Sequence, residues 1–360
     1  MTLAVQTFLR GIGSLEDLQA KYAIVSVRHP TYPNLVLLKY EQLESPFGEQ
    51  IVQECRGIIL DEADDWKLVC YRFKKFFNYG EGHAANIDWD TAQVQEKVDG
   101  SLMTTYFYDG KWHVATSGAP HAGGQVSDFP FTFAELFWKT YSDMGFTTHD
   151  MTESLCYSFE LTSQYNRVVV RHTEPSLTLI GIHDPNTFKE VKTVRCVKLF
   201  PRVKTYNLSS FDEIVESFAS IDPLSHEGYI VVDASFNRVK MKNPAYVAIH
   251  HLKDGFGVKR ITEIVRTAET SEFLTYFPEY GDLFADVQGR YEKLVKALEE
   301  LYTRIKDIEP QKDFALAVQA DKSCKLPGAM FNLRAGKVSS LKQYLREMNL
   351  DHLMKVLELK

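Results

Sequence analysis

The sequence predicts an α+β protein in which an antiparallel-sheet domain, residues 1–250, is followed by an all-helical domain, residues 251–360. Three observations support this fold class. The chain has 360 residues, which suits two hydrophobic cores better than one. Short alternating or β-branched runs dominate before residue 250, and helical periodicity dominates after it. Strands followed by helices in this order are typical of α+β chains.

The first domain is predicted from short strand-like runs that turn signals separate. In order they are YAIVSVRH, LVLLKY, GIIL, QVQEKV, SLMTTYFY, WHVATS, CYSFELT, RVVVRH, LTLIGIHD, GYIVVD and RVKMK. The dipeptide Asp109-Gly110 predicts a two-residue hairpin loop. Helices are predicted at about 14–21, 131–143 and 209–219. Ser14, with Asp17 three residues later, is close to a capping box at the first of them.

The second domain is predicted from apolar residues at helical spacing. RITEIVRTAE places them at positions 261, 264 and 265, and an apolar stripe continues through 285–308. Such a stripe usually packs in a core or against another domain. Shorter helices are predicted at 311–320, 337–347 and 350–358.

The composition excludes several classes of protein. Hydrophobic residues make up 44% of the chain and charged residues 25%, as in globular proteins. The net charge of −7 excludes a basic nucleic-acid coat, so any contact with nucleic acid requires a local positive patch. No apolar run approaches the roughly 18 residues that span a membrane, and no signal-peptide layout is present. Five cysteines without CxxC spacing predict reduced thiols in a cytoplasm, with neither disulfides nor a zinc site.

The stretch EKVDGSL raises the question of function. Lys97 lies between two strand-like runs, beside Asp99 and Gly100. Taken alone, it is best interpreted as a charged hairpin end, since one K-x-D-G pattern is weak. Five further stretches change that interpretation: ECRGIIL (54–60), FKKFFNYGE (73–81), YSFELT (157–162), EGYIVV (227–232) and VKMKNPAYV (239–247).

These stretches place charges where charges are uncommon. Lys240 and Lys242 alternate, so on a strand both ammonium groups lie on one face. Glu160 stands within an otherwise apolar strand, and Glu227 begins another. Carboxylates are unusual in such strands unless they face a site.

The ordered stretches together resemble the covalent nucleotidyltransferase superfamily, which comprises ATP-dependent ligases and mRNA capping enzymes. KVDGS, FEL, EGYIVV and VKMK match its motifs, over roughly residues 35–250. ECRG and KKFFN narrow the resemblance to the ATP-dependent RNA ligase 1 family of bacteriophages. The resemblance implies three nucleotidyl transfers: from ATP to a lysine, from the lysine to an RNA 5′-phosphate, and release of AMP when an RNA 3′-hydroxyl attacks.

The resemblance makes Lys97 the nucleophile. An unperturbed lysine, with a pKa of about 10.4, is neutral in only about one molecule in 2,500 at pH 7. The site must therefore favour the free amine, through neighbouring cations and desolvation. Lys240 and Lys242 suit that role and would also neutralise the triphosphate. The polyphosphate makes Mg²⁺ the expected metal ion, with Mn²⁺ as an alternative.

The resemblance also assigns roles to single residues. The catalytic residues would be Lys97, Glu227, Lys240 and Lys242. The residues that bind ATP would be Tyr40, Arg56, Lys75, Phe77, Gly100, Glu160, Lys240, Lys242 and Tyr246. The metal ligands would be Glu160, Glu227 and Glu272. One position departs from the family, because Ser117 precedes Gly118 where the family usually carries a lysine, and a serine supplies no charge.

Structural roles for some of these residues remain alternatives. Arg56 could form a buried salt bridge with Glu54, and Glu160 could pair with Arg167. Four basic residues could hold RNA phosphates, although a solvated surface explains them equally well: Arg195, Lys198, Arg202 and Lys204.

The predicted function is that of an ATP-dependent RNA ligase. Its partners would be the 5′-phosphate and 3′-hydroxyl ends of single-stranded RNA or of a nicked tRNA loop, and it would act as a monomer in the cytoplasm, the host's if a phage encodes it. One alternative is a DNA ligase or a GTP-using capping enzyme. Those families continue with a β-barrel, whereas the residues after 250 here are helical in pattern. A second alternative is a catalytically inactive RNA-binding descendant, against which the intact Lys97, Glu227, Lys240 and Lys242 argue.

Overall fold

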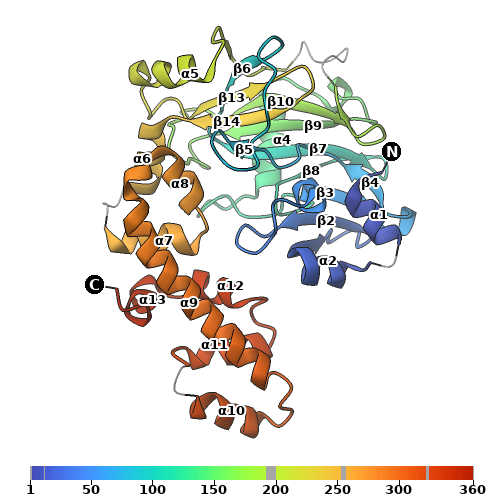
Figure 1. Cartoon of the computed structure of the whole chain (residues 1–360). Coiled ribbons are helices and arrows are strands. Elements are labelled where there is room, and N and C mark those ends of the chain that lie inside the picture. Colours follow the sequence, from blue (N-terminus) through green and yellow to red (C-terminus); the bar gives the residue numbers. More distant parts are fainter. Residues whose placement is uncertain (1, 12, 192–199, 253–256, 322–323, 360) are drawn as a thin grey trace. The chain divides into compact units, whose positions relative to one another are not determined.

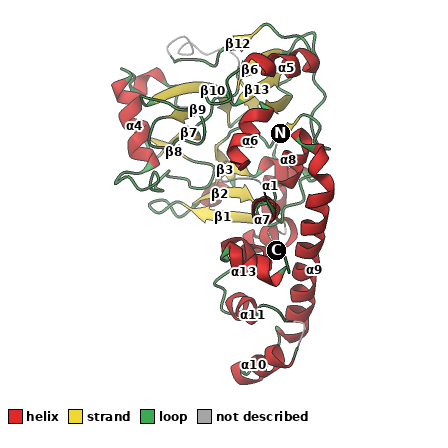
Figure 2. Cartoon of the chain, turned by 90° about the vertical axis from the view of Figure 1, so that its left-hand side faces the viewer, coloured by secondary structure: helices red, strands yellow, loops and turns green. Residues whose placement is uncertain are grey.

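The computed structural model describes residues 2–11, 13–191, 200–252, 257–321 and 324–359 (Figure 1). The chain forms two compact units, residues 1–250 and residues 251–360. The first unit contains three sheets, and the described part of the second is helical. Figure 2 shows the strands of the first unit in yellow and the helices of the second in red.

The first sheet is antiparallel, with the order β1-β2-β3-β4. The helix α2 begins directly after Ser14, whose side chain accepts a hydrogen bond from the backbone N–H of Asp17, so the predicted capping box is confirmed. Apolar residues of this sheet pack against the small helices that precede and interrupt it. The elements are α1 (Ala4–Arg10), α2 (Leu15–Tyr22), β1 (Ile24–Arg28), β2 (Leu35–Tyr40), α3 (Gln50–Glu54), β3 (Arg56–Asp61), a 3₁₀ turn (Glu62–Asp64) and β4 (Lys67–Cys70).

The second sheet has the order β11-β10-β9-β7-β8 and is also antiparallel. Asp109 and Gly110 both adopt positive φ between β7 and β8, which is the geometry of a type I′ turn and confirms the predicted hairpin. The helix α4 covers this sheet with an aromatic-rich core. The elements are β7 (Ser101–Tyr108), β8 (Lys111–Ala115), α4 (Phe133–Asp143), a 3₁₀ turn (Thr148–Asp150), β9 (Cys156–Thr162), β10 (Ser176–Asp184) and β11 (Lys189–Glu190).

The third sheet has the order β12-β6-β13-β14-β5, in which only the β14–β5 pair is parallel. One face of it packs beneath α5 through Val94, Ile214, Tyr229, Val231 and Met241. The opposite face therefore carries the alternate residues of β6, β13 and β14. The elements are β5 (Phe77–Asn78), β6 (Gln93–Glu96), β12 (Thr205–Tyr206), α5 (Phe211–Ser217), a 3₁₀ turn (Phe218–Ser220), β13 (Gly228–Val232) and β14 (Arg238–Lys242).

One predicted strand is wrong. The run RVVVRH, residues 167–172, is irregular in the structure. The backbone N–H groups of Val169 and Val170 donate to Asp99 Oδ2 at 3.0 and 2.8 Å. A buried carboxylate thus takes the donors that a strand ladder would have used, and it outweighs the β-propensity of three consecutive valines.

The second unit is built around the long helix α9, as the apolar stripe predicted. Phe284, Val287, Tyr291, Leu294 and Leu298 lie on its buried side. The sequence patterns did not predict α8 or α11, which are short helices separated from the adjacent helices by turns. The elements are α6 (Pro244–Leu252), which joins the units, then α7 (Val258–Arg266), α8 (Thr270–Tyr276), a 3₁₀ turn (Pro278–Tyr280), α9 (Gly281–Ile305), α10 (Gln311–Ala320), α11 (Pro327–Arg334), α12 (Leu341–Glu347) and α13 (Leu350–Val356).

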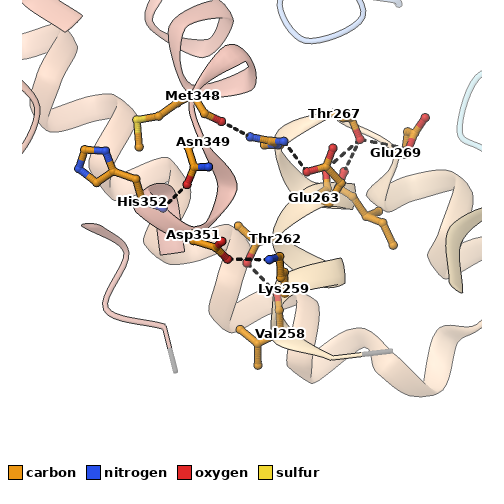
Figure 3. A network of polar contacts seen from close by, with 12 residues as sticks. Val258, Lys259, Thr262, Glu263, Thr267, Glu269, Met348, Asn349, Asp351 and His352 are labelled. Atoms are coloured by element: carbon orange, nitrogen blue, oxygen red, sulfur yellow. Dashed lines mark hydrogen bonds and ion pairs between the residues drawn. The ribbon is translucent and has the colours of Figure 1, made fainter. Parts of the chain in front are cut away.

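Polar contacts connect α7 to the end of the chain (Figure 3). Arg266 donates to the carbonyl of Met348 at 2.6 Å, and Lys259 pairs with Asp351 at 2.7 Å. The first contact is partly buried, so it contributes more to holding α12 and α13 in place than the exposed ion pair does.

Two further sequence expectations concern the whole chain. None of the described helices combines the length and the apolar character that a membrane crossing requires. The described cysteines Cys55, Cys70, Cys156 and Cys324 are free thiols, whereas Cys196 lies outside the described residues.

Candidate active site

Three adjacent strands of the third sheet bring Lys97, Glu227 and Lys242 together. Strand β6 pairs with β13, and the backbone N–H of Lys97 donates to the carbonyl of Gly228 at 2.8 Å. Strand β13 pairs with β14 so that Gly228 stands opposite Lys242. Lys97 and Lys242 thus flank Gly228 from both sides, and Glu227 directly precedes it.

Gly228 is required at this position. Its φ is +149°, and a Cβ atom there would lie 2.2 Å from the carbonyl oxygen of Met241. Any other residue would clash with the backbone of β14. The absence of a side chain lets the backbone of β14 approach β13 closely at Lys242.

Glu227 connects the two lysines. The Nζ atom of Lys97 lies 2.5 Å from Glu227 Oε2, and the Nζ atom of Lys242 lies 3.6 Å from Oε1. The carboxylate side chain is 5% exposed, and those of Lys97 and Lys242 are 22% and 16% exposed. Solvent screens such buried ion pairs only weakly, and removal of one partner leaves the remaining charges buried without a counter-charge. The carboxylate therefore fixes the position of the Lys97 amine.

Lys240 and Arg56 both lie near the ring of Phe76. The Nζ atom of Lys240 is 6.0 Å from the centroid of Phe76, and the guanidinium carbon of Arg56 is 5.0 Å from it. Both distances suit cation–π contacts. Of the phenylalanines in the KKFFN stretch, the sequence singled out only Phe77 for the site, so Phe76 was missed. The signal available was its place in the KKFFN stretch, which the resemblance already associated with the site.

Glu160 belongs to β9 of the second sheet, which β7 holds in register through the pair Leu102 and Glu160. The pKa of Glu160 is raised to about 8, chiefly by burial and also by the charges of Glu227 and Asp99, which together outweigh the lowering effect of Lys97 and Arg56. These mutual effects place Glu160 near the other predicted residues. Raised carboxyl pKa values are frequent at functional sites.

The raised pKa of Glu160 predicts a pH-dependent stability in protein free of metal and nucleotide. The ordinary pKa is 4.5 and the folded value about 8, so the folded state binds the proton more tightly. Stability from this group is complete below pH 4.5 and falls as the pH rises to about 8. Relative to the wild type, Glu160→Gln should gain on the order of 1 kcal/mol of unfolding free energy per pH unit in that window, with no further gain above it. Urea titrations in EDTA from pH 5 to pH 9 measure the difference, and parallel curves would refute it.

Asp99, two residues after Lys97, holds the KVDGS stretch in place through its carboxylate. Its carboxylate is buried and accepts from the N–H groups of Val169 and Val170 and from the hydroxyl of Tyr246, at 2.9 Å. Tyr246, on α6, is 2% exposed. The structure thus shows Tyr246 supporting Asp99, and a direct contact of Tyr246 with the nucleotide stays a prediction.

Gly100 lies against β9. A Cβ atom at this position would be 2.4 Å from the carbonyl oxygen of Leu161, the residue after Glu160. The glycine therefore allows the segment after Lys97 to approach the strand that carries Glu160. The predicted approach of a ribose to Gly100 remains untested.

Lys75 lies in a cage of aromatic rings. Its Nζ atom is 4.9 Å from the ring centroid of Tyr40, 4.2 Å from that of Phe47 and 5.1 Å from that of Phe77. Tyr40, Lys75 and Phe77 were all predicted for the site, and the fold brings the three together. Phe47 was not predicted, because it precedes the ECRG stretch and carries no pattern of its own.

The structure does not support the alternative pairings. Glu54 accepts hydrogen bonds from the side chain of Gln50 at 2.8 Å and from the N–H of Val5 at 3.1 Å, and its cationic partner is Lys74, at 3.9 Å, rather than Arg56. The guanidinium of Arg167 donates to the carbonyl of Val169. No ion pair between Glu160 and Arg167 occurs in the described part of the chain.

Glu272 lies on α8 in the helical unit, so its role as a metal ligand stays a prediction. Arg202 and Lys204 line a hollow beside β6 and β10, whereas Arg195 and Lys198 lie outside the described residues. Ser117 is exposed at the end of β8.

A cavity of about 770 Å³ adjoins the site. Lys75, Phe76 and Phe77 line one part of it, and Arg238, paired with Glu190, lines another. Lys97 and Glu227 do not line it. The cavity is large enough for a nucleotide-sized ligand. It is basic and aromatic in character, but it borders the lysine cluster rather than enclosing it.

Comparison with known proteins identifies the family of this chain. A family model described as RNA ligase matches residues 54–246, more than half of the chain and a range that includes Arg56, Lys97 and Tyr246. A Rhodothermus phage RM378 protein named RNA ligase is 26% identical over 74% of this chain and 78% of its own. A protein of Autographa californica nuclear polyhedrosis virus is 28% identical over 74% of this chain. That protein is named as a bifunctional polynucleotide kinase/RNA ligase. The chain spans 40% of that longer protein.

Solved structures show a partial likeness. An archaeal ATP-dependent RNA ligase overlaps 85% of this chain and 85% of its own, with a TM-score of 0.46 and 12% identity. The overlap is limited at this score, so the account of the fold depends on the strands and helices of this chain itself.

Proposed function

We propose that this chain, which belongs to the RNA ligase family, joins RNA ends by way of an AMP group carried on Lys97. The substrates are ATP and the 5′-phosphate and 3′-hydroxyl ends of RNA. The observation that carries the proposal is the Lys97–Glu227–Lys242 cluster. A partly exposed lysine, fixed by a buried carboxylate and flanked by a second cation, suits attack on a phosphate.

The first step converts ATP and Lys97 to a phosphoramidate. The ammonium group of Lys97 first loses one proton to solvent, and the resulting amine forms a bond from Nζ to the α-phosphorus of ATP as a second proton leaves Nζ for solvent. The bond from that phosphorus to the bridging oxygen breaks, and pyrophosphate leaves with the electron pair. Lys240 and Lys242 lie on the same strand face and would stabilise the charge that develops on the phosphate oxygens.

The second and third steps transfer the AMP and then release it. An oxygen of the RNA 5′-phosphate attacks the α-phosphorus and forms a 5′–5′ pyrophosphate linkage, while the bond from phosphorus to Nζ breaks and Nζ takes up a proton from solvent to leave as the Lys97 amine. The 3′-hydroxyl of the other end then attacks the 5′-phosphate. AMP leaves as the phosphodiester bond forms, and the hydroxyl proton passes to solvent.

The donor set fits a Mg²⁺ ion that arrives with the phosphates. Glu160 and Glu227 each offer a carboxylate beside Lys97. The described residues contain no group of three or more side chains that would hold a metal on its own. Mg²⁺ commonly takes one or two protein carboxylates and completes its shell with phosphate oxygens and water. When bound, the ion would neutralise phosphate charge.

The helical unit would bias the choice of RNA, for example toward a nicked tRNA loop. Its described residues, 257–321 and 324–359, contain helices and no strand, which does not favour a DNA ligase or a capping enzyme with a β-barrel in this position. A substrate panel of linear single strands and cleaved tRNA would separate the candidate RNAs.

The test of the proposal is incubation of the full chain with Mg²⁺ and α-labelled ATP, or GTP, followed by denaturing electrophoresis. We expect a label from ATP and none from GTP, located at Lys97 by mass spectrometry of the labelled peptide. A label from GTP would indicate a capping enzyme instead. No label from either, on folded protein freed of bound AMP, would indicate a binding protein without catalysis.

A further inference from the structure

An unassigned lysine lies at the edge of the site. Lys39 is near the end of β2, and its partner in the register with β3 is Arg56. Residues directly opposite each other on antiparallel strands point to the same face. On this face the preceding residues Leu35 and Leu37 pack with Tyr106 and Ala115 of the second sheet. Lys39 and Arg56 therefore face the sheet that carries Glu160, at the point where the apolar contact between the sheets ends.

A bulge at Gly57 shapes this corner. The register passes from Leu38–Ile58 to Lys39–Arg56 and leaves Gly57 as the extra residue, with φ of +86°. A Cβ atom at Gly57 would lie 2.8 Å from the carbonyl oxygen of Ser117. The bulge thus lets the loop after β8 cross directly over the backbone between Arg56 and Ile58.

The ammonium group of Lys39 lies close to the backbone of the same loop. Its Nζ atom lies 3.6 Å from the point that a Cβ atom of Gly118 would occupy. The loop at Ser117 and Gly118 therefore lies against the backbone at Gly57, next to Arg56, and against the ammonium group of Lys39. Because Gly118 has no side chain, the ammonium group can approach the loop backbone.

Within the described residues neither cation directly contacts an acid, and the charge of Arg56 acts on Glu160 without such a contact. Neither Lys39 nor Arg56 forms an ion pair or a hydrogen bond with any acid in the part of the chain that the structure describes, and the NH1 atom of Arg56 is buried without a hydrogen-bond partner. Like charges directly opposite each other on paired strands destabilise the pairing. A buried guanidinium nitrogen without a partner is costly as well. Both costs are relieved when an anion binds between the two side chains.

We propose that Lys39 is a phosphate-binding residue that acts with Arg56 on the triphosphate of ATP. This assignment depends on the proposed function. Arg56 connects the pair to the lysine cluster, because its charge acts on Glu160 together with that of Lys97. Phosphate is the anion that the reaction brings to this position, and lysine binds it as a point charge. The phosphates of RNA are the other source of the same chemistry, and the experiment distinguishes the two.

The experiment compares Lys39→Met, which keeps the length of the side chain, with Lys39→Arg, which keeps its charge. The matched control is Lys111→Met, since Lys111 is exposed at the start of β8. The first measurement is the rate of adenylylation against ATP concentration, without RNA. We expect Lys39→Met to raise the KM for ATP about tenfold to a hundredfold, as for the loss of one charged hydrogen bond. Lys39→Arg should stay within about threefold of the wild type and the control should be unchanged.

The second measurement is the equilibrium affinity for ATP and for AMP in a Lys97→Ala background, where no adduct can form. Lys39→Met should weaken the binding of ATP and leave that of AMP unchanged, because AMP lacks the outer phosphates. The third is sealing of RNA that already carries AMP at its 5′ end, with no ATP added, where we expect no change. A defect confined to this sealing step would assign Lys39 to RNA and overturn the proposal.

The remaining outcomes are decisive as well. An unchanged KM in Lys39→Met overturns the proposal, as does an equal loss in Lys39→Arg, which would indicate a packing role. If the wild type itself forms no adduct, the proposed function fails first. If the wild type forms the adduct and Lys39→Met behaves as the wild type does, only the assignment of Lys39 fails.

Discussion

Replacement of Lys97 by alanine is expected to abolish the AMP adduct while the protein stays folded. The side chain is 22% exposed and its main contact is the ion pair with Glu227, so its loss removes little apolar packing. The nucleophile of a covalent enzyme has no substitute, so we expect neither Lys240 nor Lys242 to carry AMP in its place. Both belong to β14, which β13 separates from β6. Denaturing electrophoresis with labelled ATP measures the adduct, and thermal unfolding reports the fold.

The matched control is Lys111→Ala. This lysine lies at the exposed end of the β7–β8 hairpin. It therefore is the charged hairpin residue that Lys97 would be if the K-x-D-G pattern had no catalytic role. It should label as the wild type does. An adduct that persists in Lys97→Ala would place the nucleophile elsewhere.

Glu227→Gln is expected to slow adduct formation by about a hundredfold to a thousandfold. The substitution keeps the shape of the side chain but removes the charge that lies between Lys97 and Lys242. Breaking a buried ion pair by removing one partner costs about 3–5 kcal/mol, and about 1.4 kcal/mol corresponds to a factor of ten in rate. Single-turnover rates of adenylylation at saturating ATP and Mg²⁺ measure the effect.

A double-mutant cycle with Lys242→Met separates this role from a general loss of stability. Because Glu227 and Lys242 contact each other, the rate loss in the double variant should be smaller than the product of the two single losses. Glu213→Gln, on the exposed α5, is the control for a lost carboxylate. A near-normal rate in Glu227→Gln would show that the motif has been aligned to the wrong residue.

The sequence by itself determined most of the local structure. Hairpin and capping signals at Asp109-Gly110 and Ser14 depend only on neighbouring residues, so they could be read directly. The stripe of α9 is likewise periodic along one element. The order of the motifs also predicted the family, since spacing along a chain needs no coordinates.

Only the tertiary structure decided which of these residues meet. The pairing of β6, β13 and β14 sets the contact of Glu227 with Lys97, which is 130 positions away in the chain. The same holds for the irregular segment at Val169 and Val170, where a carboxylate 70 positions away replaced the strand ladder. Phe47 and Phe76 joined the site through ring contacts that no local pattern marks.

Lys39 shows most clearly what could not be predicted from the sequence alone. In the sequence it is one charged residue at the end of an apolar run, and such residues are ordinarily solvated. Strand register places it opposite Arg56, and a bulge at a glycine brings the loop of Gly118 against its ammonium group. Local patterns are set by the preferences of neighbouring residues. The residues that surround a charged side chain are set by long-range strand register and close backbone approach, which exist only once the chain has folded.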